Sequence, residues 1–207
     1  MNLSVPRRRL AAALGAVAAL LTAAGCDRST EPVAPALDVG LTVTTARESD
    51  LLRIDYTLVN RTGADIVVFS GVPAEDTHDS PVVDPNAVYA TARDDNTVEL
   101  AKRVFAPPEG VGVAVDFVVR GAVLAPQASL GEVLRIPLPL TARRPYDSSA
   151  RLPDRVGRAV FCVGVAHRDA VPPIPAASGD TDERASYPHR ASVAREQQLV
   201  CGEPFPL

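Results

Sequence analysis

Three cysteines are the residues of this sequence with the most distinctive chemistry, and they lie far apart, at positions 26, 162 and 201. Cys26 closes a short apolar run, and the small residues just before it suit the pocket of a signal peptidase. If Cys26 belongs to a processing site, two cysteines remain. Outside the cytoplasm an even number of remaining cysteines favours a disulfide, here Cys162–Cys201. A closed loop of that size would add about 3–4 kcal/mol in the chain-entropy model.

Cysteine catalysis is the competing chemistry, because a thiolate beside a histidine base is a nucleophile. His167 is the histidine nearest to Cys162 in sequence, five positions later. On one regular strand an odd spacing places two side chains on opposite faces. We therefore predict no catalytic residue at this pair. His78 or His189 could act as the base only if the fold brings its side chain next to Cys162.

Two acidic clusters raise the question of a metal. Residues 75–79 combine three carboxylates with His78, and residues 180–183 contain three more carboxylates. Neither spacing fits an EF-hand or a zinc site. The sequence also contains no nucleophile elbow, phosphate loop or dinucleotide fingerprint. We predict solvated acidic loops, no metal, no cofactor and no enzyme activity.

The N-terminal segment has the features of a targeting sequence. Three arginines at positions 7–9 precede an uncharged apolar run, residues 10–24. That run is too short to cross a bilayer, which takes about 20 apolar residues. It has the length of a signal-peptide core, so residues 1–25 are predicted to be a signal peptide.

The end of that segment, Ala23-Ala24-Gly25-Cys26, resembles the lipobox of bacterial lipoproteins. It departs from the family at Ala23, where leucine is commonest. The resemblance implies cleavage before Cys26, diacylation of its thiol, and a protein held on the extracytoplasmic side of the cell membrane or outer membrane. Two acyl chains anchor stably where one is marginal. The alternative is an ordinary signal peptide followed by a coincidental cysteine.

Charge and composition bound the rest of the chain. Residues 1–25 hold three Arg and no acidic residue, so residues 26–207 carry 18 basic and 25 acidic residues, a net charge of −7. This balance argues against nucleic acid as a partner. The length suits one domain. Nineteen prolines among short apolar runs favour strands and turns over long helices.

Residues 26–36 have no apolar period and read as a flexible tether, while residues 37–207 show period-two alternation that predicts strands. Pro137 and Pro139 place one strand at a sheet edge, because proline cannot donate to a ladder. The apolar run 159–166 suits the most central strand. About eight short strands and no clear helix predict an antiparallel, immunoglobulin-like β-sandwich. The expected strands are residues 37–43, 52–58, 66–69, 88–93, 97–104, 113–119, 134–140, 159–166 and 195–201.

One long patternless stretch, residues 168–191, is predicted to be a loop at one end of the sandwich. Loops of that length are usually functional or unstructured. Ligand-binding loops cluster at the ends of such sandwiches. We therefore predict that Tyr187 and His189 contact a ligand, the alternative being an insertion without a role.

Two resemblances bear on function. The paired strands at residues 52–60, 66–71 and 124–140 are similar to bacterial immunoglobulin-like modules. The pattern of a strand, Asn60, a turn and then the run Ile-Val-Val-Phe-Ser-Gly at residues 66–71 also resembles a module named after an intracellular proteinase inhibitor of bacilli. The first hypothesis is a non-enzymatic binding or structural lipoprotein with an envelope protein as partner. The alternatives are a protease-inhibitor-like module, and a hydrolase or metal protein whose site assembles only in space.

Overall fold

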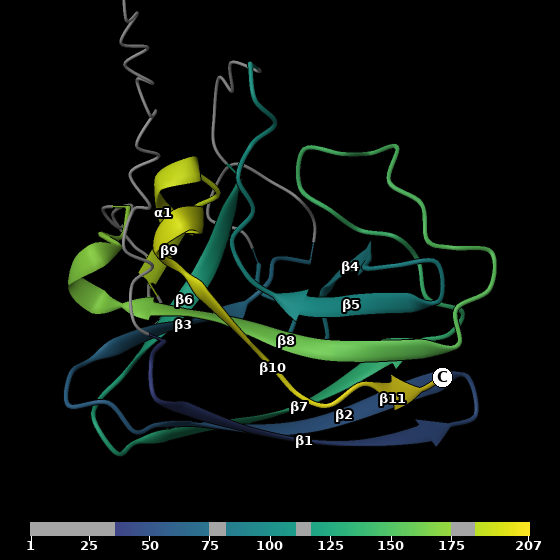
Figure 1. Cartoon of the computed structure of the whole chain (residues 1–207), viewed down its shortest axis with the longest axis horizontal. Coiled ribbons are helices and arrows are strands. Elements are labelled where there is room, and N and C mark those ends of the chain that lie inside the picture. Colours follow the sequence, from purple (N-terminus) through teal and green to yellow (C-terminus); the bar gives the residue numbers. More distant parts are fainter. Residues whose placement is uncertain (1–35, 75–81, 111–116, 175–184) are drawn as a thin grey trace, which may run out of the picture. The chain divides into compact units, whose positions relative to one another are not determined.

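Two β-sheets packed face to face make up the fold (Figure 1). The structure is a computed structural model, and it describes residues 36–74, 82–110, 117–174 and 185–207. The predicted signal peptide, Cys26, most of the tether, both acidic clusters and residues 113–116 of the strand predicted at 113–119 lie outside the described residues. No helix in the described ranges has the length and apolar character needed to cross a membrane.

The smaller sheet has the order β1-β2-β7, with both pairings antiparallel. Its strands are β1 (Val39–Glu48), β2 (Leu51–Asn60) and β7 (Ser129–Pro137). The predicted alternation holds in β2, where Leu52, Ile54, Tyr56 and Leu58 are buried. β7 lies at the edge of this sheet, which confirms the position that its prolines predict.

The larger sheet is built around β8 (Arg158–His167), whose residues 159–166 are all buried. This confirms the prediction of a central strand. Val165 pairs with both Val68 and Gln198, so β3 and β10 lie on opposite sides of β8. The other strands are β3 (Ile66–Gly71), β4 (Tyr89–Ala92), β5 (Thr97–Lys102), β6 (Val118–Leu124), β9 (Ala185–Pro188), β10 (Gln198–Cys201) and β11 (Phe205–Pro206).

Six strands have the order of an immunoglobulin-like sandwich, with β1, β2 and β7 as strands A, B and E, and β3, β8 and β10 as C, F and G. The larger sheet contains five further strands, β4, β5, β6, β9 and β11. The hydrophobic core lies between the two sheets, with Ile54, Leu134 and Phe161 fully buried. One pairing differs from the antiparallel prediction, because β5 runs parallel to β8.

The predicted loop at residues 168–191 is wrong in its described parts. A 3-10 turn, η1 (Arg168–Ala170), follows β8, and β9 then pairs with β6, with Tyr187 opposite Val119. The prediction of no helix is also wrong, because α1 (Ala191–Glu196) precedes β10 and occupies the start of the strand predicted at residues 195–201. Tertiary contacts stabilise these short elements, and no local sequence pattern indicates such contacts.

Candidate functional site

A groove lies at the end of the sandwich where β8 begins. The connection from β7 to β8, residues 138–157, crosses this end beside the β1–β2 turn. Together they enclose about 600 Å³. We call this space the end groove, and its lining residues are Arg47, Ser49, Asp50, Leu138, Pro139, Leu140, Leu152, Pro153, Asp154, Val156 and Leu207.

Most of the lining of the end groove is apolar, and its charges are Arg47, Asp50 and Asp154. A second hollow, of about 330 Å³, lies on the other side of Pro139 and Leu140 and reaches Asn86 and Val88. Ligand sites in proteins are typically concave and apolar with a few polar groups that fix orientation. The end groove has this character.

Backbone hydrogen bonds fasten both limbs of the β7–β8 connection. Arg143 and Ala90 exchange two N–H···O bonds of 2.9 and 3.0 Å. Leu138 donates to the Asp50 carbonyl at 2.7 Å, and Gly157 donates to the Asn96 carbonyl at 3.1 Å. Because backbone hydrogen bonds to the β1–β2 turn, to β4 and to the β4–β5 turn hold these walls, the groove is largely preformed.

The end groove and the predicted ligand contacts lie in different parts of the fold. Neither Tyr187 nor His189 lines the end groove, although Tyr146 of the same β7–β8 connection reaches the His189 carbonyl. Tyr187 is only 1% exposed and packs edge-to-face on Phe69. Burial raises the pKa of its phenol. In this conformation Tyr187 is a core residue, and a ligand contact by it remains a prediction.

His189 is fully buried and joins three parts of the chain. The Phe105 amide donates to His189 Nδ1 at 2.8 Å, so the neutral ring carries its proton on Nε2, which lies 3.1 Å from the Tyr89 hydroxyl. Tyr146 Oη donates to the His189 carbonyl at 2.9 Å. Burial lowers the pKa of His189 to about 3. The ring is therefore a neutral structural bridge at physiological pH.

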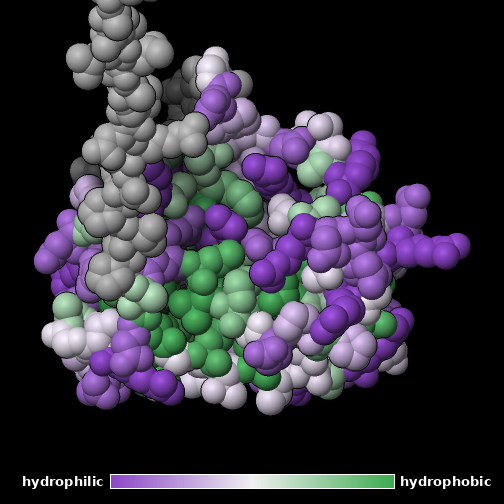
Figure 2. All heavy atoms as spheres, viewed as in Figure 1, coloured by the Kyte–Doolittle hydropathy of each residue, from purple (hydrophilic) through white to green (hydrophobic). Residues whose placement is uncertain are grey.

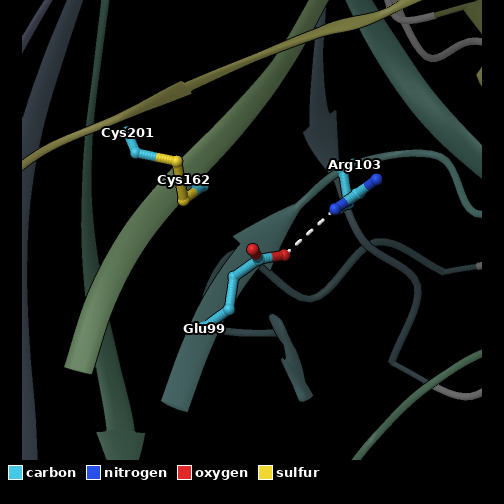
Figure 3. Close-up of a disulfide and its surroundings, with 4 residues drawn as sticks. All are labelled: Glu99, Arg103, Cys162 and Cys201. Carbon is cyan, nitrogen blue, oxygen red and sulfur yellow. Dashed lines mark hydrogen bonds and ion pairs between the residues drawn. A yellow bond between two sulfur atoms is a disulfide. The ribbon is translucent and has the colours of Figure 1, made fainter. Parts of the chain in front are cut away.

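The predicted disulfide is present. Cys162 in β8 and Cys201 in β10 are directly paired residues with Cα atoms 4.1 Å apart, and their sulfurs are bonded (Figure 3). The ion pair of Glu99 and Arg103 lies beyond β8 in the same view. A sulfur bonded to Cys201 is no thiolate, so Cys162 is not a nucleophile in this state. His167 at the end of β8 is exposed, whereas Cys162 is buried.

The sequence analysis missed a buried ion pair between the two sheets. Lys102 Nζ in β5 lies 2.7 Å from Glu132 Oε2 in β7, and the Tyr56 hydroxyl donates to the same oxygen at 2.6 Å. Lys102 Nζ also donates to the Pro85 carbonyl at 3.2 Å. The Lys102 side chain is fully buried. This cluster fastens the sheets together, because each charged group has its partner on the opposite sheet.

Within the described ranges, no three side chains among His, Cys, Asp and Glu gather as metal ligands would. Comparisons with protein-family models, with curated proteins and with solved structures found no match to this chain.

Proposed function

We propose that this chain is a lipid-anchored protein of the bacterial envelope whose β-sandwich binds another envelope component, without catalysis, at the end groove. The anchor rests on the apolar run and the lipobox-like residues that end in Cys26. The binding role rests on the end groove. The partner we propose is a protein, because a mostly apolar lining with a few charges at its margin is complementary to protein side chains.

The preformed shape of the end groove is the observation that carries the binding role. A groove fastened at Asp50, Ala90 and Asn96 does not have to be ordered when a partner binds, which lowers the entropic cost of association. Loops held on a rigid β-scaffold are also where binding residues concentrate. The apolar lining contributes affinity, and Arg47, Asp50 and Asp154 provide polar contacts at the margin.

A matched pair of substitutions tests this function. Leu152→Glu places a carboxylate inside the end groove, whereas Val133→Glu places one on β7 at a residue that is 42% exposed and does not line the groove. The full chain is tagged and expressed in a bacterium that makes it, crosslinked in place, and its partners are quantified by mass spectrometry. We expect wild type and Val133→Glu to recover the same protein.

Recovery by Leu152→Glu should fall about ten-fold or more, because an unpaired charge would have to be buried against the partner. Thermal unfolding of both variants checks that the domain remains folded. Equal recovery by the folded Leu152→Glu and Val133→Glu variants would remove the groove from the proposal.

The hypothesis of a protease-inhibitor-like module can be tested separately. The stretch that resembles the inhibitor module forms β2 and β3, and its Asn60 is a buried residue that binds the Leu124 carbonyl at 2.9 Å. These are framework contacts, so the resemblance lies in the scaffold. A panel of proteases assayed with the full chain decides whether any is inhibited.

A further inference from the structure

The edges of the two sheets are not equally protected. An edge strand offers a row of N–H and C=O groups to any other strand, and proteins block such edges with proline, charge or covering chain. β7 carries Pro137, β11 carries Pro206, β4 is covered by a bridge from Arg143, and β9 is covered by a bridge from Ile174. Four of the edges are therefore closed.

Two edges stay open in the described part of the chain: β10, which has only four residues and pairs with β8 alone, and β1. β1 is ten residues long, pairs with β2 alone, and contains no proline or lysine. Its outer-face residue Thr42 is exposed, and so are residues 44–48. Long, regular and β-branched, this strand is the kind of edge that pairs with another strand.

An apolar margin accompanies this edge. Val39, Leu41 and Val43 point toward the core but are only partly buried, because the sandwich is open on this side. Leu199 and Val200 of β10 are also half-buried. Figure 2 shows hydrophobic residues gathered over β10, beside β1. A strand added to β1 would cover the exposed parts of these side chains.

We propose that β1 pairs antiparallel with β1 of a second copy of this chain, which joins two three-stranded sheets into one across a two-fold axis. A two-fold axis normal to the sheet keeps each residue on its own face, so only residues of the same parity can be opposite one another. The strand must therefore be complementary to itself in one of a few registers.

Within β1, the register centred on Thr42 gives the longest pairing in which no apolar inner-face residue meets a charge. It places Leu41 opposite the second copy's Val43 on the inner face and Thr42 opposite its own counterpart on the outer face, and apolar and Thr–Thr pairs of this kind are favourable. Centring on Val43 would oppose Val39 to Arg47. Centring on Thr44 would oppose Leu41 to Arg47.

Cysteine substitution tests both the pairing and the register. Thr42→Cys brings two thiols together at the two-fold axis, and copper–phenanthroline with oxygen should oxidise them to a disulfide-linked dimer of the full chain on a non-reducing gel. Thr57→Cys is the matched control, because Thr57 pairs with Thr42 on the adjacent strand β2 and is also exposed. It should give no crosslinked dimer.

A charge substitution measures the association without any crosslink. Thr42→Lys opposes two lysines at the axis and should weaken the dimerisation of the detergent-purified full chain by about five-fold or more, whereas Thr57→Lys should not. Light scattering reports the mass of each. A monomeric wild-type chain at every concentration, or a Thr42→Cys variant that crosslinks only to a different protein, would overturn self-pairing.

Discussion

A single neutral ring, His189, makes the stability of this domain depend on pH. Its position in the patternless stretch 168–191 predicts a ligand contact, but its ring accepts a hydrogen bond from the Phe105 amide in the interior. A histidine in an irregular segment carries no local sign of burial. The neighbours that bury it, Tyr89 and Phe105, come from 84 to 100 residues away in sequence.

We predict that the domain loses stability as the pH falls below about 6.5, the ordinary pKa of histidine in the unfolded chain. The folded pKa is about 3, so over this range the unfolded state binds a proton that the folded state does not. Linkage then lowers the free energy of unfolding by about 2 kcal/mol between pH 8 and pH 5. Urea unfolding at a series of pH values measures this slope.

His189→Asn separates the contribution of this ring from the acidic residues, because the amide oxygen of Asn can still accept from Phe105 and does not titrate. The slope between pH 8 and pH 5 should shrink in this variant. The exposed His167 supplies the control, and His167→Asn should keep the wild-type slope. An unchanged slope in His189→Asn would contradict the buried neutral ring.

The sequence contains a pattern that could have indicated the ion pair of Lys102 and Glu132. Val98, Leu100, Lys102 and Val104 share one parity, as do Leu130, Glu132, Leu134 and Ile136, so each charge stands in an apolar row. A basic and an acidic residue on the inward faces of two strands indicate a buried pair. The structure confirms that both side chains point between the sheets.

We predict that Glu132→Gln destabilises the domain by about 3–5 kcal/mol, because it leaves the buried Lys102 cation without its counter-charge. The double variant Lys102→Met with Glu132→Leu should be far closer to wild type, since it removes both charges. Chemical denaturation of wild type, Lys102→Met, Glu132→Leu and the double variant gives the coupling energy, and Glu132→Gln is measured beside them. A Glu132→Gln variant as stable as wild type would show that the pair contributes nothing.

At the scale of elements, local patterns predicted several strands and failed where tertiary contacts decide. Alternation predicted β2, and continuous apolar runs predicted β3 and β8. α1 has six residues and no side-chain cap, too short to be stable by propensity, and its Val193 is buried in the fold. The parallel pairing of β5 with β8 is equally nonlocal, because no local feature specifies the direction of a neighbour.

The disulfide joins two elements, the short strand β10 and the central strand β8. We predict that replacing both Cys162 and Cys201, by Ala and Ser, lowers the free energy of unfolding by about 4 kcal/mol in the chain-entropy model, given the 39-residue separation. Urea unfolding measures the loss. Alkylation before and after reduction should label no thiol and then both thiols, and two free thiols in the unreduced protein would contradict the bridge.

At the scale of the whole molecule, the end groove could not be found by reading the sequence. Its walls come from Asp50, from residues 138–156 and from Leu207, which only the topology brings together. No spacing rule links three such segments. The disulfide was predictable, because counting cysteines uses redox chemistry and not position in space.

Membrane attachment through Cys26 is a proposal from the sequence, and the charge of the domain helps to test it. Residues 26–207 carry a net charge of −7, so anionic headgroups repel the domain and electrostatics does not hold it at a membrane. We predict that labelled fatty acid is incorporated into the wild-type chain and into Cys201→Ser, but not into Cys26→Ser, which should be released from the membrane or remain uncleaved. Gel fluorography of the purified proteins measures the label, and the N-terminus of each reports cleavage. Equal labelling of Cys26→Ser and wild type would place the acyl chains elsewhere, and an unlabelled wild type would remove the anchor.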